Sequence, residues 1–366
     1  MIPSLTGGGT ERAKLRLASG LIGLGHEVDI VVATRRSAVL APEMPPDARY
    51  IALGAPRTLG ALPGLCRYLR RARPDIMISS LHEANNIAAL AKLVTRSRAR
   101  LLITLHNNTS ATLALQSDRR TSWAIRAAGY LHRLADSVGA VSDCVARDAE
   151  RVWRLPAGAI KTLPNPLDSD TVRALADCPL DHPWFAQGMP PVILSCGRLV
   201  PDKGFDTLIA AFAKTRQAHA ARLVILGAGP LRATLLRQAA ASRVADDVQV
   251  LDFDQNPFRY MRRAAVFALA SRLEGYPNAL IEALACGCRV VATDCPSGPR
   301  EILSDNACGL LVPVDDVDAL AAALAKALTA SDWTVHAEPL LQKHAPQRAA
   351  RAHLDVLGLP ALSANP

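Results

Sequence analysis

Short apolar runs alternate with longer amphipathic stretches along almost the whole chain. Short runs rich in Val, Ile and Leu between Gly and Pro turns are typical of strands buried in a parallel sheet, and the longer stretches predict helices. This order predicts an α/β protein built from repeated strand–helix units. The predicted strands are 28–33, 50–53, 75–79, 100–105, 137–142, 192–196, 222–227, 266–270, 289–293 and 310–313, with another that begins at 248.

The length of 366 residues predicts two domains, each large enough to enclose its own hydrophobic core. The Pro-rich stretch over residues 178–191 is expected to form the linker between them. We therefore expect an N-terminal domain over residues 1–180 and a C-terminal domain over residues 181–340. A final segment over residues 341–366 contains one more predicted helix.

The beginning of the chain lacks a predicted strand where the pattern requires one. Residues 6–12, Thr-Gly-Gly-Gly-Thr-Glu-Arg, form a Gly-rich turn that leads into a predicted helix over 12–24. In a βαβ unit such a turn follows a strand of about five or six residues. Here only Met1 and Ile2 precede Pro3. We therefore expect the first strand of the sheet to be missing, as it would be if the start codon had been assigned too late.

Positive charge is concentrated in the first half of the chain. Residues 1–185 hold 24 Lys and Arg against 16 Asp and Glu, whereas residues 186–366 hold 18 against 17. Anionic membranes and nucleic acids are therefore both candidate partners. Residues 119–135 place four arginines among apolar residues, which predicts either a basic helix lying on lipid or an ordinary surface helix. Aromatic residues make up only 4% of the chain, which argues against a surface that stacks single-stranded bases. Ordered motifs at the predicted strand ends argue against a merely charged surface, so of the two candidates we expect no nucleic acid.

The composition favours a cytoplasmic protein. No apolar run reaches the ~18 residues of a membrane-spanning helix, and the first residues do not resemble a secretory signal peptide. The eight cysteines are scattered and lack the paired spacing of a zinc site, which is typical of small buried residues in a reducing compartment. If the basic first half binds lipid, the protein is peripheral to the membrane.

Residues 271–300 hold the densest set of candidate site residues. A turn opens a short predicted helix that ends at Gly287. A helix that begins at a Gly/Pro turn presents free N–H groups and the positive end of its dipole, which favours a phosphate ligand. The residues of this turn and of the helix start are Gly275, Tyr276, Pro277, Asn278 and Ala279.

Two carboxylates flank this turn, Glu274 before the predicted helix and Glu282 within it. Eight residues correspond to ~12 Å of rise along a helix. That distance exceeds the ~5–9.5 Å between the carboxylates of a glycoside hydrolase. The two carboxylates would therefore hold different parts of one long ligand. The alternative is one glutamate in a turn and one on a solvent-facing side of a helix.

Three further candidates lie in turns at strand ends or helix starts. Arg198 and Lys203 stand beside a Gly turn before a predicted helix, which indicates either a second anion site or two exposed basic residues. His106 follows the strand over 100–105, at the edge where open α/β sheets bind ligands. The N–H groups of Gly8 and Gly9 either approach a phosphate or belong to a merely flexible turn.

These motifs closely resemble those of the retaining glycosyltransferases of family 4. The resemblance rests on Gly-Arg-x4-Lys-Gly over 197–204 and on Glu-x7-Glu over 274–282, framed by Ser-Arg-x-Glu-Gly-x-Pro-Asn and Ala-x-Ala-Cys-Gly-x-x-Val-Val-Ala-Thr-Asp. It extends over roughly residues 3–328. It implies the GT-B fold, in which two Rossmann-like domains with parallel sheets face each other across a cleft. It also implies a final helix that crosses back to the first domain.

The resemblance gives each candidate residue a role. Those implied to hold the nucleotide diphosphate are Arg198, Lys203, Gly8, Gly9, Gly275, Tyr276, Pro277, Asn278 and Ala279. With this fixed positive charge, neither a metal nor another cofactor is expected. Glu282 would accept the ribose hydroxyls, Glu274 would hold the sugar, and His106 would orient the sugar or the acceptor. Asp254 would lie beside the base, although Asp252 and Asp254 together imitate a metal-binding pair.

The function implied is metal-independent transfer of a sugar from a nucleotide-diphosphate sugar, more often a UDP-sugar, with retention of configuration. The sequence Pro-Ser-Gly-Pro-Arg-Glu-Ile-Leu at 296–303 resembles members that build exopolysaccharide, O-antigen or capsule units. Together with the basic first half, it favours a glycan or lipid-linked acceptor at the cytoplasmic face of the inner membrane. Two alternatives remain: another GT-B enzyme, such as a sugar phosphorylase or nucleotide-sugar epimerase, and a non-enzymatic basic protein that binds membrane or nucleic acid.

Overall fold

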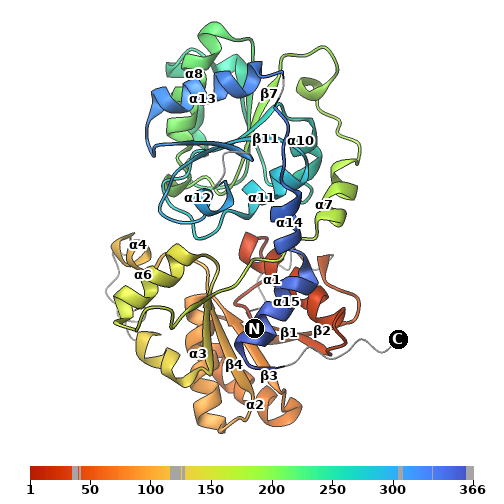
Figure 1. The fold of residues 1–366 in the computed structure, drawn as a ribbon, viewed down its shortest axis with the longest axis vertical. Helices are drawn as coiled ribbons and strands as arrows, with labels where there is room; N and C mark the ends of the chain where they lie inside the picture. Colours follow the sequence, from red (N-terminus) through yellow and green to blue (C-terminus); the bar gives the residue numbers. More distant parts are fainter. Residues whose placement is uncertain are drawn as a thin grey trace. The chain divides into compact units, whose positions relative to one another are not determined.

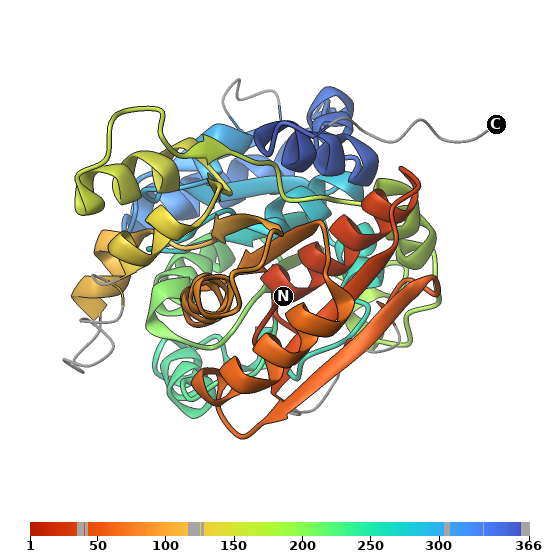
Figure 2. The same cartoon turned by 90° about the horizontal axis from the view of Figure 1, so that it is seen from below.

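The structure is a computed structural model that describes residues 1–34, 40, 43–115, 125, 128–303, 308–331 and 333–359. The chain divides into two compact units, and each unit packs helices around parallel strands (Figures 1 and 2). Unit 1 consists of Met1–Leu167 and Lys343–Pro366, and unit 2 consists of Asp168–Gln342.

Unit 2 contains one parallel sheet with the strand order β12-β11-β10-β7-β8-β9. Its strands are β7 (Val192–Cys196), β8 (Arg222–Leu226), β9 (Val248–Leu251), β10 (Val266–Leu269), β11 (Arg289–Thr293) and β12 (Gly309–Val312). Its helices are α7 (Ser169–Ala176), α8 (Phe205–Ala218), α9 (Arg232–Ala241), α10 (Phe258–Arg263), α11 (Asn278–Ala285), α12 (Pro299–Ile302) and α13 (Val317–Thr329), followed by α14 (Glu338–Lys343). Three short 3₁₀ turns are η4 (Pro183–Phe185), η5 (Pro201–Lys203) and η6 (Ala245–Asp247).

The core of unit 2 lies between this sheet and the helices α8 and α13. Phe212 of α8 and Leu324 of α13 are fully buried in one cluster with Ile225 and Val291 of the sheet. These strands are apolar on both faces, as expected for a parallel sheet that is covered by helices. The carboxyl ends of the strands therefore carry the exposed turns in which the predicted site residues lie.

Unit 2 begins earlier in the chain than the predicted boundary at residue 180. The difference arises from α7, which packs against α10 and α11. Side chains at α10 also close the end of α7, since Arg263 donates to the carbonyl of Ala176 and Asn256 donates to that of Leu175. A short helix with its carbonyls bonded in this way belongs to the unit that supplies the donors.

Unit 1 contains two groups of parallel strands, the pair β1-β2 and the sheet β3-β4-β5-β6. Its strands are β1 (Val28–Thr34), β2 (Ala48–Ala55), β3 (Ile76–Ser80), β4 (Arg100–Leu105), β5 (Ser137–Ala140) and β6 (Lys161–Thr162). Its helices are α1 (Gly9–Ile22), α2 (Leu62–Ala72), α3 (His82–Thr95), α4 (Thr109–Leu115), α6 (Asp143–Trp153) and α15 (Pro346–Val356), with 3₁₀ turns η2 (Thr58–Ala61) and η3 (His132–Leu134).

The first two residues lie between the two groups of strands in unit 1. Ile2 forms a parallel bridge with Val32 of β1, and the carbonyl of Met1 accepts a hydrogen bond from the N–H of Ser80 at the end of β3. The sheet of unit 1 is therefore interrupted at the position where the sequence lacks a predicted strand. The C-terminal helix α15 also belongs to unit 1, since its Leu354 packs with Leu17 of α1.

No helix in the part of the chain that the structure describes is both long and apolar enough to cross a membrane. The basic helix predicted over residues 119–135 lies largely outside the described residues, which include only Ile125 and residues 128–135 of that stretch. The final turn of the stretch is η3, in which His132 is buried.

Candidate functional site

The closest contact between predicted site residues joins two loops of unit 2. The Nζ atom of Lys203 lies 2.6 Å from Oε1 of Glu274, and the hydroxyl of Ser271 donates to the same oxygen at 2.7 Å. Only 9% of the Glu274 side chain and 21% of the Lys203 side chain are exposed. The cluster of Lys203, Ser271 and Glu274 is therefore a partly buried ion pair at the carboxyl ends of the strands.

Gly204 explains how the turn that carries Lys203 approaches the second loop. It follows η5, caps α8 with a left-handed φ of 60°, and faces the end of β10. A Cβ atom at this position would lie 2.0 Å from the carbonyl oxygen of Ala270, so only glycine fits. The close approach places the ammonium group of Lys203 next to the loop that begins at Ser271.

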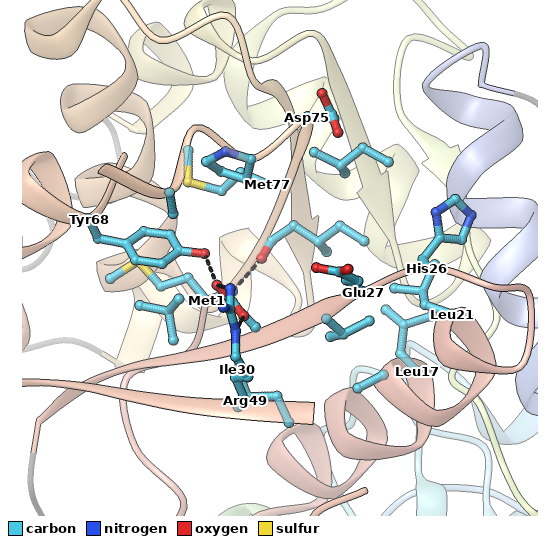
Figure 3. A pocket seen from close by; sticks show the side chains of 18 of the residues that line it. Met1, Leu17, Leu21, His26, Glu27, Ile30, Arg49, Tyr68, Asp75 and Met77 are labelled. Carbon is cyan, nitrogen blue, oxygen red and sulfur yellow. Dashed lines mark hydrogen bonds and ion pairs between the residues drawn. The ribbon is translucent and has the colours of Figure 1, made fainter. Parts of the chain in front are cut away.

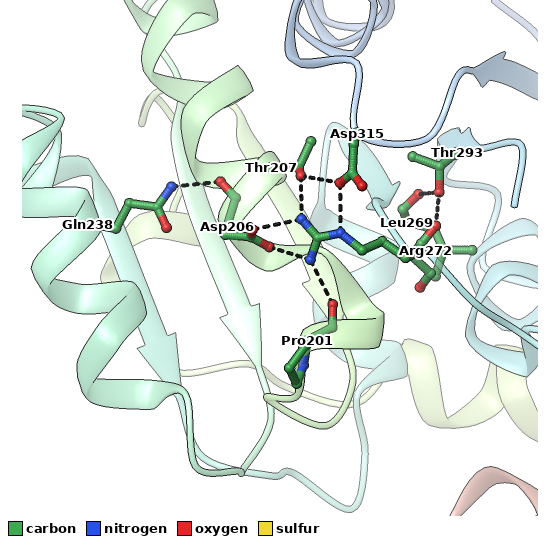
Figure 4. Close-up of polar contacts among 9 residues, drawn as sticks. Pro201, Asp206, Thr207, Gln238, Leu269, Arg272, Thr293 and Asp315 are labelled. Carbon is green, nitrogen blue, oxygen red and sulfur yellow. Dashed lines mark hydrogen bonds and ion pairs between the residues drawn. The ribbon is translucent and has the colours of Figure 1, made fainter. Parts of the chain in front are cut away.

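Arg272 holds these loops together, and the sequence analysis did not assign it a role. Its guanidinium donates to both carboxylate oxygens of Asp206 at 2.9 and 2.7 Å and to Asp315 at 2.7 Å (Figure 4). It also donates to the carbonyl of Pro201 at 2.8 Å, while its own backbone N–H donates to the carbonyl of Asp202. The bonds to Asp206 raise the pKa of Arg272 above its usual value. Arg272 therefore positions the neighbouring residues Lys203 and Glu274.

The position of Arg272 in the sequence could have indicated this role. It stands inside the same Ser-Arg-x-Glu-Gly motif that contains Glu274. An arginine two residues before a candidate carboxylate has five N–H donors in a planar fork, which suits several carbonyl and carboxylate acceptors at once. Its acceptors come from segments far away in the sequence, so only the fold reveals them.

Glu282 faces inward from α11. Only 5% of its surface is exposed, so the alternative of a solvent-facing helix residue is wrong for Glu282. Burial and then the charge of Glu282 raise the pKa of the thiol of Cys196, the last residue of β7. Tyr276, in the turn before α11, is partly buried, and burial raises the pKa of its hydroxyl. The helix α11 therefore carries a buried carboxylate.

Arg198 and the Asp-x-Asp motif differ in how their charges are satisfied. Arg198 is exposed, and its guanidinium makes no ion pair with any described residue. Asp254 accepts a hydrogen bond from Arg259 at 2.6 Å, and Asp252 pairs with Arg232 at 2.8 Å. Each aspartate thus has its own arginine partner. Over the described ranges, no three His, Cys, Asp or Glu side chains converge as metal ligands.

The Gly-rich loop of unit 1 already binds a carboxylate of its own helix. Oε2 of Glu11 accepts hydrogen bonds from the N–H groups of Gly7 at 2.9 Å and Gly8 at 2.8 Å. Its other oxygen accepts a hydrogen bond from the hydroxyl of Ser4 at 2.7 Å. Gly9 is the first residue of α1. The N–H group of Gly8, predicted to face a phosphate, therefore faces the carboxylate of Glu11 in this structure.

Glu11 is a second residue that the sequence analysis did not single out. It is 5% exposed and occupies the third position of α1, where a glutamate commonly reaches back to the helix start. That spacing is visible in the sequence, so the signal was available. The carboxylate neutralises the positive end of the α1 dipole from the first turn of the helix.

His106 follows β4, as predicted, and is buried in the interior of unit 1. Its Nε2 atom lies 3.3 Å from Oγ1 of Thr104, and only 6% of its surface is exposed. Burial and the nearby cation of Lys14 hold the pKa of His106 well below its usual value. Burial also lowers the pKa of Lys14 to about 7. At neutral pH the imidazole of His106 is therefore uncharged.

The structure thus brings Lys203 and Glu274 into direct contact and buries Glu282 on α11 of the same unit. Gly8 and His106 lie in unit 1, on the loop before α1 and at the end of β4. The roles implied for these residues in binding and catalysis stay predictions.

Comparisons with known proteins agree with this organisation. Residues 7–171 match the family model described as Glycosyltransferase Family 4, and residues 181–339 match the model described as Glycosyl transferases group 1. A phosphatidyl-myo-inositol mannosyltransferase from Mycolicibacterium smegmatis is 27% identical over 87% of this chain and 80% of its own length.

A second relative is the N-acetylgalactosamine-N,N'-diacetylbacillosaminyl-diphospho-undecaprenol 4-alpha-N-acetylgalactosaminyltransferase of Campylobacter jejuni. It is 44% identical over 35% of this chain, and the match spans 34% of its length, about a third. The solved structure of Anabaena HepE in complex with UDP and glucose covers 98% of both chains with a TM-score of 0.78 and 19% identity. This likeness confirms the predicted GT-B fold class, although the predicted arrangement of two sheets across a cleft stays a prediction. The two family models together extend over most of the chain, which therefore belongs to the group 1 glycosyltransferases with a family 4 N-terminal half.

Proposed function

We propose that this protein transfers a sugar from a nucleotide-diphosphate sugar to a glycan or lipid-linked acceptor, with retention of configuration and without a metal. The observation that carries this proposal is the cluster of Lys203, Ser271 and Glu274, fixed at the carboxyl edge of the unit 2 sheet close to an exposed Arg198. The cluster offers a cation that would bind a diphosphate and a carboxylate that would bind a sugar. A hydrogen bond joins these two groups in the structure.

The cations would act on the leaving group. When the bond between the anomeric carbon and the diphosphate breaks, negative charge develops on the phosphate oxygens. The ammonium of Lys203 and the guanidinium of Arg198 would neutralise that charge, since charge-assisted hydrogen bonds to phosphate are among the strongest in proteins. Lys203 pairs with Glu274 in the structure, so its charge is held in place before any ligand binds.

The carboxylates would act on the two sugars of the donor. Glu274 accepts two hydrogen bonds at Oε1, which leaves Oε2 to accept hydroxyls of the transferred sugar and to favour positive charge at the anomeric carbon. Glu282 would accept the ribose hydroxyls. The acceptor hydroxyl would form its bond on the face that the diphosphate leaves, and its proton would pass to the leaving phosphate oxygen. A neutral His106 would orient the sugar or acceptor as a hydrogen-bonding group.

The printed names of related proteins support a UDP-sugar and a lipid-linked or polysaccharide acceptor. The Anabaena HepE structures contain UDP, UDP-glucose, or UDP with glucose. The Campylobacter relative is named for a diphospho-undecaprenol acceptor and an alpha linkage, and an Erwinia amylovora relative is named for amylovoran biosynthesis. Mycobacterial relatives are named as GDP-mannose-dependent, so a GDP-sugar is the competing donor.

The decisive experiment incubates the purified protein with panels of UDP- and GDP-sugars and with glycans linked to diphospho-undecaprenol. We expect release of UDP, an alpha-linked product by NMR, and the same rate in the presence of EDTA. Loss of all activity with EDTA and rescue by Mn²⁺ would contradict metal independence and direct attention to Asp252 and Asp254. Release of inorganic phosphate or of a free epimer would contradict a transferase.

Peripheral attachment to the cytoplasmic face of the membrane is part of the same proposal. It rests on the excess of Arg in the first half, since each basic residue near anionic lipid contributes ~1 kcal/mol. Arg119, Arg120 and Arg126 lie outside the described residues, so the test is made in solution. Replacing all three with Glu should abolish sedimentation with anionic liposomes and leave donor binding unchanged. Binding of duplex DNA but not of liposomes would contradict the proposal and favour a water-soluble acceptor.

A further inference from the structure

Side-chain hydroxyl groups bond segments that are distant in the sequence in both units. In unit 1, the hydroxyl of Tyr68 on α2 donates to Asp29 of β1 at 2.6 Å, and both residues line a cavity of about 500 Å³ (Figure 3). Neither of them belongs to the candidate site. In unit 2, the hydroxyl of Thr293 at the end of β11 bonds the loop that carries Glu274. The contact of Thr293 can therefore affect the chemistry of the site.

Thr293 is a fully buried polar residue at the end of a strand. None of its surface is exposed, and the three residues before it in β11 are apolar. A buried hydroxyl costs free energy unless it is hydrogen-bonded. Its neighbours are the carbonyl oxygens of Ser271 at 2.5 Å and of Leu269 at 3.3 Å (Figure 4). Carbonyl oxygens only accept, so Thr293 donates its single proton, and the shorter distance directs that proton to Ser271.

The bond from Thr293 holds one side of a peptide group whose other side is also held. The carbonyl of Ser271 and the N–H of Arg272 belong to one planar peptide. The carbonyl accepts from Thr293 of β11, and the N–H donates to the carbonyl of Asp202 in η5 at 2.7 Å. Because the carbonyl and the N–H of a trans peptide point in opposite directions, these two bonds leave the peptide little freedom to rotate.

The peptide held in this way carries the side chain that orients Glu274. Ser271 is 1% exposed, and its hydroxyl donates to Oε1 of Glu274 at 2.7 Å. Lys203, which directly follows Asp202, donates to the same oxygen at 2.6 Å. Both contacts to Oε1 therefore come from residues at or next to the fixed peptide. They leave the other carboxylate oxygen, Oε2, for a ligand.

We propose that Thr293 is a positioning residue for sugar transfer, which acts on the transferred sugar through Ser271 and Glu274. This assignment rests on the proposed function, because it is there that Glu274 holds the sugar. Thr293 fixes the carbonyl of Ser271, the hydroxyl of Ser271 fixes Oε1 of Glu274, and Oε2 then keeps one direction toward the sugar. Valine at position 293 would have a similar shape, but it would release the Ser271 carbonyl. A displacement of about 1 Å in a group that orients the substrate can lower the rate about 10²-fold.

The test compares the unmodified protein with Thr293→Val, Thr293→Ser and the matched control Thr215→Val. Thr215 is also a buried threonine of unit 2, and its hydroxyl lies 3.0 and 3.3 Å from the carbonyls of Ala211 and Ala321, on α8 and α13. The control therefore loses a buried hydroxyl of the same kind away from the loop of Glu274. Steady-state kinetics with the donor sugar gives kcat and KM, and calorimetry gives the Kd of UDP.

We expect Thr293→Val to lower kcat by about tenfold or more. The Kd of UDP should stay unchanged, because UDP lacks the transferred sugar. Thr293→Ser keeps a hydroxyl donor and should regain most of the lost kcat, and Thr215→Val should keep the kcat of the unmodified protein. Unchanged kcat in Thr293→Val, an equal loss in Thr215→Val, or an equal fall in UDP affinity would overturn the proposal.

A second set of variants tests the route through Ser271. Ser271→Ala removes the hydroxyl that bonds Glu274 and keeps the carbonyl that Thr293 bonds. If Thr293 acts through Ser271, the double variant should have the same kcat as Ser271→Ala alone. Losses that multiply would contradict this route. If Thr293→Val does not fold, Thr293→Cys replaces it, since a thiol is a weaker donor. Its kcat should then lie below that of Thr293→Ser, and equal values would contradict the proposal.

Hydrogen exchange followed by mass spectrometry separates this proposal from the proposed function. The N–H groups of Arg272 and Leu273 both donate to the carbonyl of Asp202. Thr293→Val should speed their exchange by about tenfold or more, and Thr215→Val should leave it unchanged. If the unmodified protein transfers no sugar, the proposed function fails, and exchange still decides whether Thr293 holds this loop. Unchanged exchange at Arg272 and Leu273 in Thr293→Val would overturn the positioning role.

Discussion

The turn before α8 in unit 2 and the turn before α1 in unit 1 both join glycine to the start of a helix, and they are held by different kinds of contact. Near α8, Lys203 pairs with Glu274, which lies 71 residues further along the chain. Near α1, the N–H groups of Gly7 and Gly8 bind Glu11, which lies within four residues of both. The first turn depends on the tertiary fold, whereas the second is a local helix cap.

The surroundings of the two turns also differ. In unit 2 a continuous sheet supports the loops, and Arg272 links three of them through its guanidinium. In unit 1 the sheet is interrupted beside α1, and buried imidazoles lie close to the buried amine of Lys14. Both units contain ion pairs, and the contrast teaches that unit 1 in addition buries imidazoles whose pKa burial lowers.

The largest expected effect is selective unfolding of unit 1 in mild acid. Burial lowers the pKa of His132 and of His353 to about 3, from an ordinary value near 6.5. Since the folded pKa is below the unfolded pKa, this stability is complete above pH 6.5 and is lost as the pH falls toward 3. Each group loses about 1.4 kcal/mol per pH unit, so the two together lose about 4 kcal/mol by pH 5. His106, also in unit 1, adds to the loss in the same direction.

Hydrogen exchange followed by mass spectrometry between pH 7 and pH 4 measures the loss of stability separately for peptides of each unit. The exchange rates are corrected for the intrinsic pH dependence of amide exchange. We expect the amides of β4 and α15 to lose protection before those of β7 and β11. His132→Phe keeps an aromatic ring against Trp153, whose ring centroid lies 4.0 Å away, and should make the acid transition less steep by about one proton. Simultaneous loss of protection in both units would refute the contrast.

The second effect concerns the glycines of the two turns. An alanine Cβ at position 204 would lie 2.0 Å from the carbonyl oxygen of Ala270, on a residue with φ of 60°. Gly204→Ala should therefore destabilise unit 2 by about 3 kcal/mol or more. Gly8→Ala is the matched control, because its φ is −74° and the nearest atom, Oε2 of Glu11, would be 3.5 Å away. We expect it to cost less than about 1 kcal/mol by urea unfolding. Equal costs at the two positions would show that the turns are not held differently.

Much of the fold could be predicted from local sequence, because buried strands leave a strong signal. The strands over 100–105, 192–196 and 289–293 lie at their predicted bounds, since each is a largely apolar run that is followed by a glycine or a polar residue. The helix α9 was not predicted, and only Leu235 and Ala239 of it are buried. A helix with so narrow an apolar face gives little periodicity to detect.

The candidate site was predicted as a set of residues and not as a set of contacts. Sequence motifs indicated Lys203 and Glu274, but their pairing depends on the path of two loops that the sequence does not specify. Arg272 has acceptors in segments up to 71 residues away, so no local pattern contains them. The spacing of the two glutamates in the sequence left open whether Glu282 faces solvent or is buried. The packing of α11 buries it.

The third effect tests what the tertiary pair of unit 2 does for a ligand. Lys203→Met removes the ammonium and keeps most of the aliphatic chain, so the affinity for UDP should fall by about 1.5–3 kcal/mol, a factor of roughly 10 to 150. Lys214→Met is the control, since Lys214 is exposed on α8 and, among the residues that the structure describes, pairs only with exposed Asp318. Isothermal titration calorimetry measures both. Unchanged UDP affinity in a folded Lys203→Met protein would contradict the proposed diphosphate contact.

The smallest effect tests the local cap of unit 1. Glu11→Gln keeps the shape of the side chain and one acceptor oxygen, but it removes the negative charge that faces the N–H groups of Gly7 and Gly8. The loss of charge-assisted bonds at a buried site should cost about 1–2 kcal/mol in the free energy of unfolding.

Glu83→Gln is the control, because Glu83 also lies in the first turn of a helix, α3, and is exposed. A helix-dipole contact of that kind contributes only about 0.3–1 kcal/mol and is screened by salt. Urea unfolding at low and high salt therefore separates the two cases: the Glu11→Gln cost should persist in high salt, and the Glu83→Gln cost should vanish. If both costs vanish, Glu11 acts as a solvent-screened charge and the loop of α1 is not held by a buried local bond.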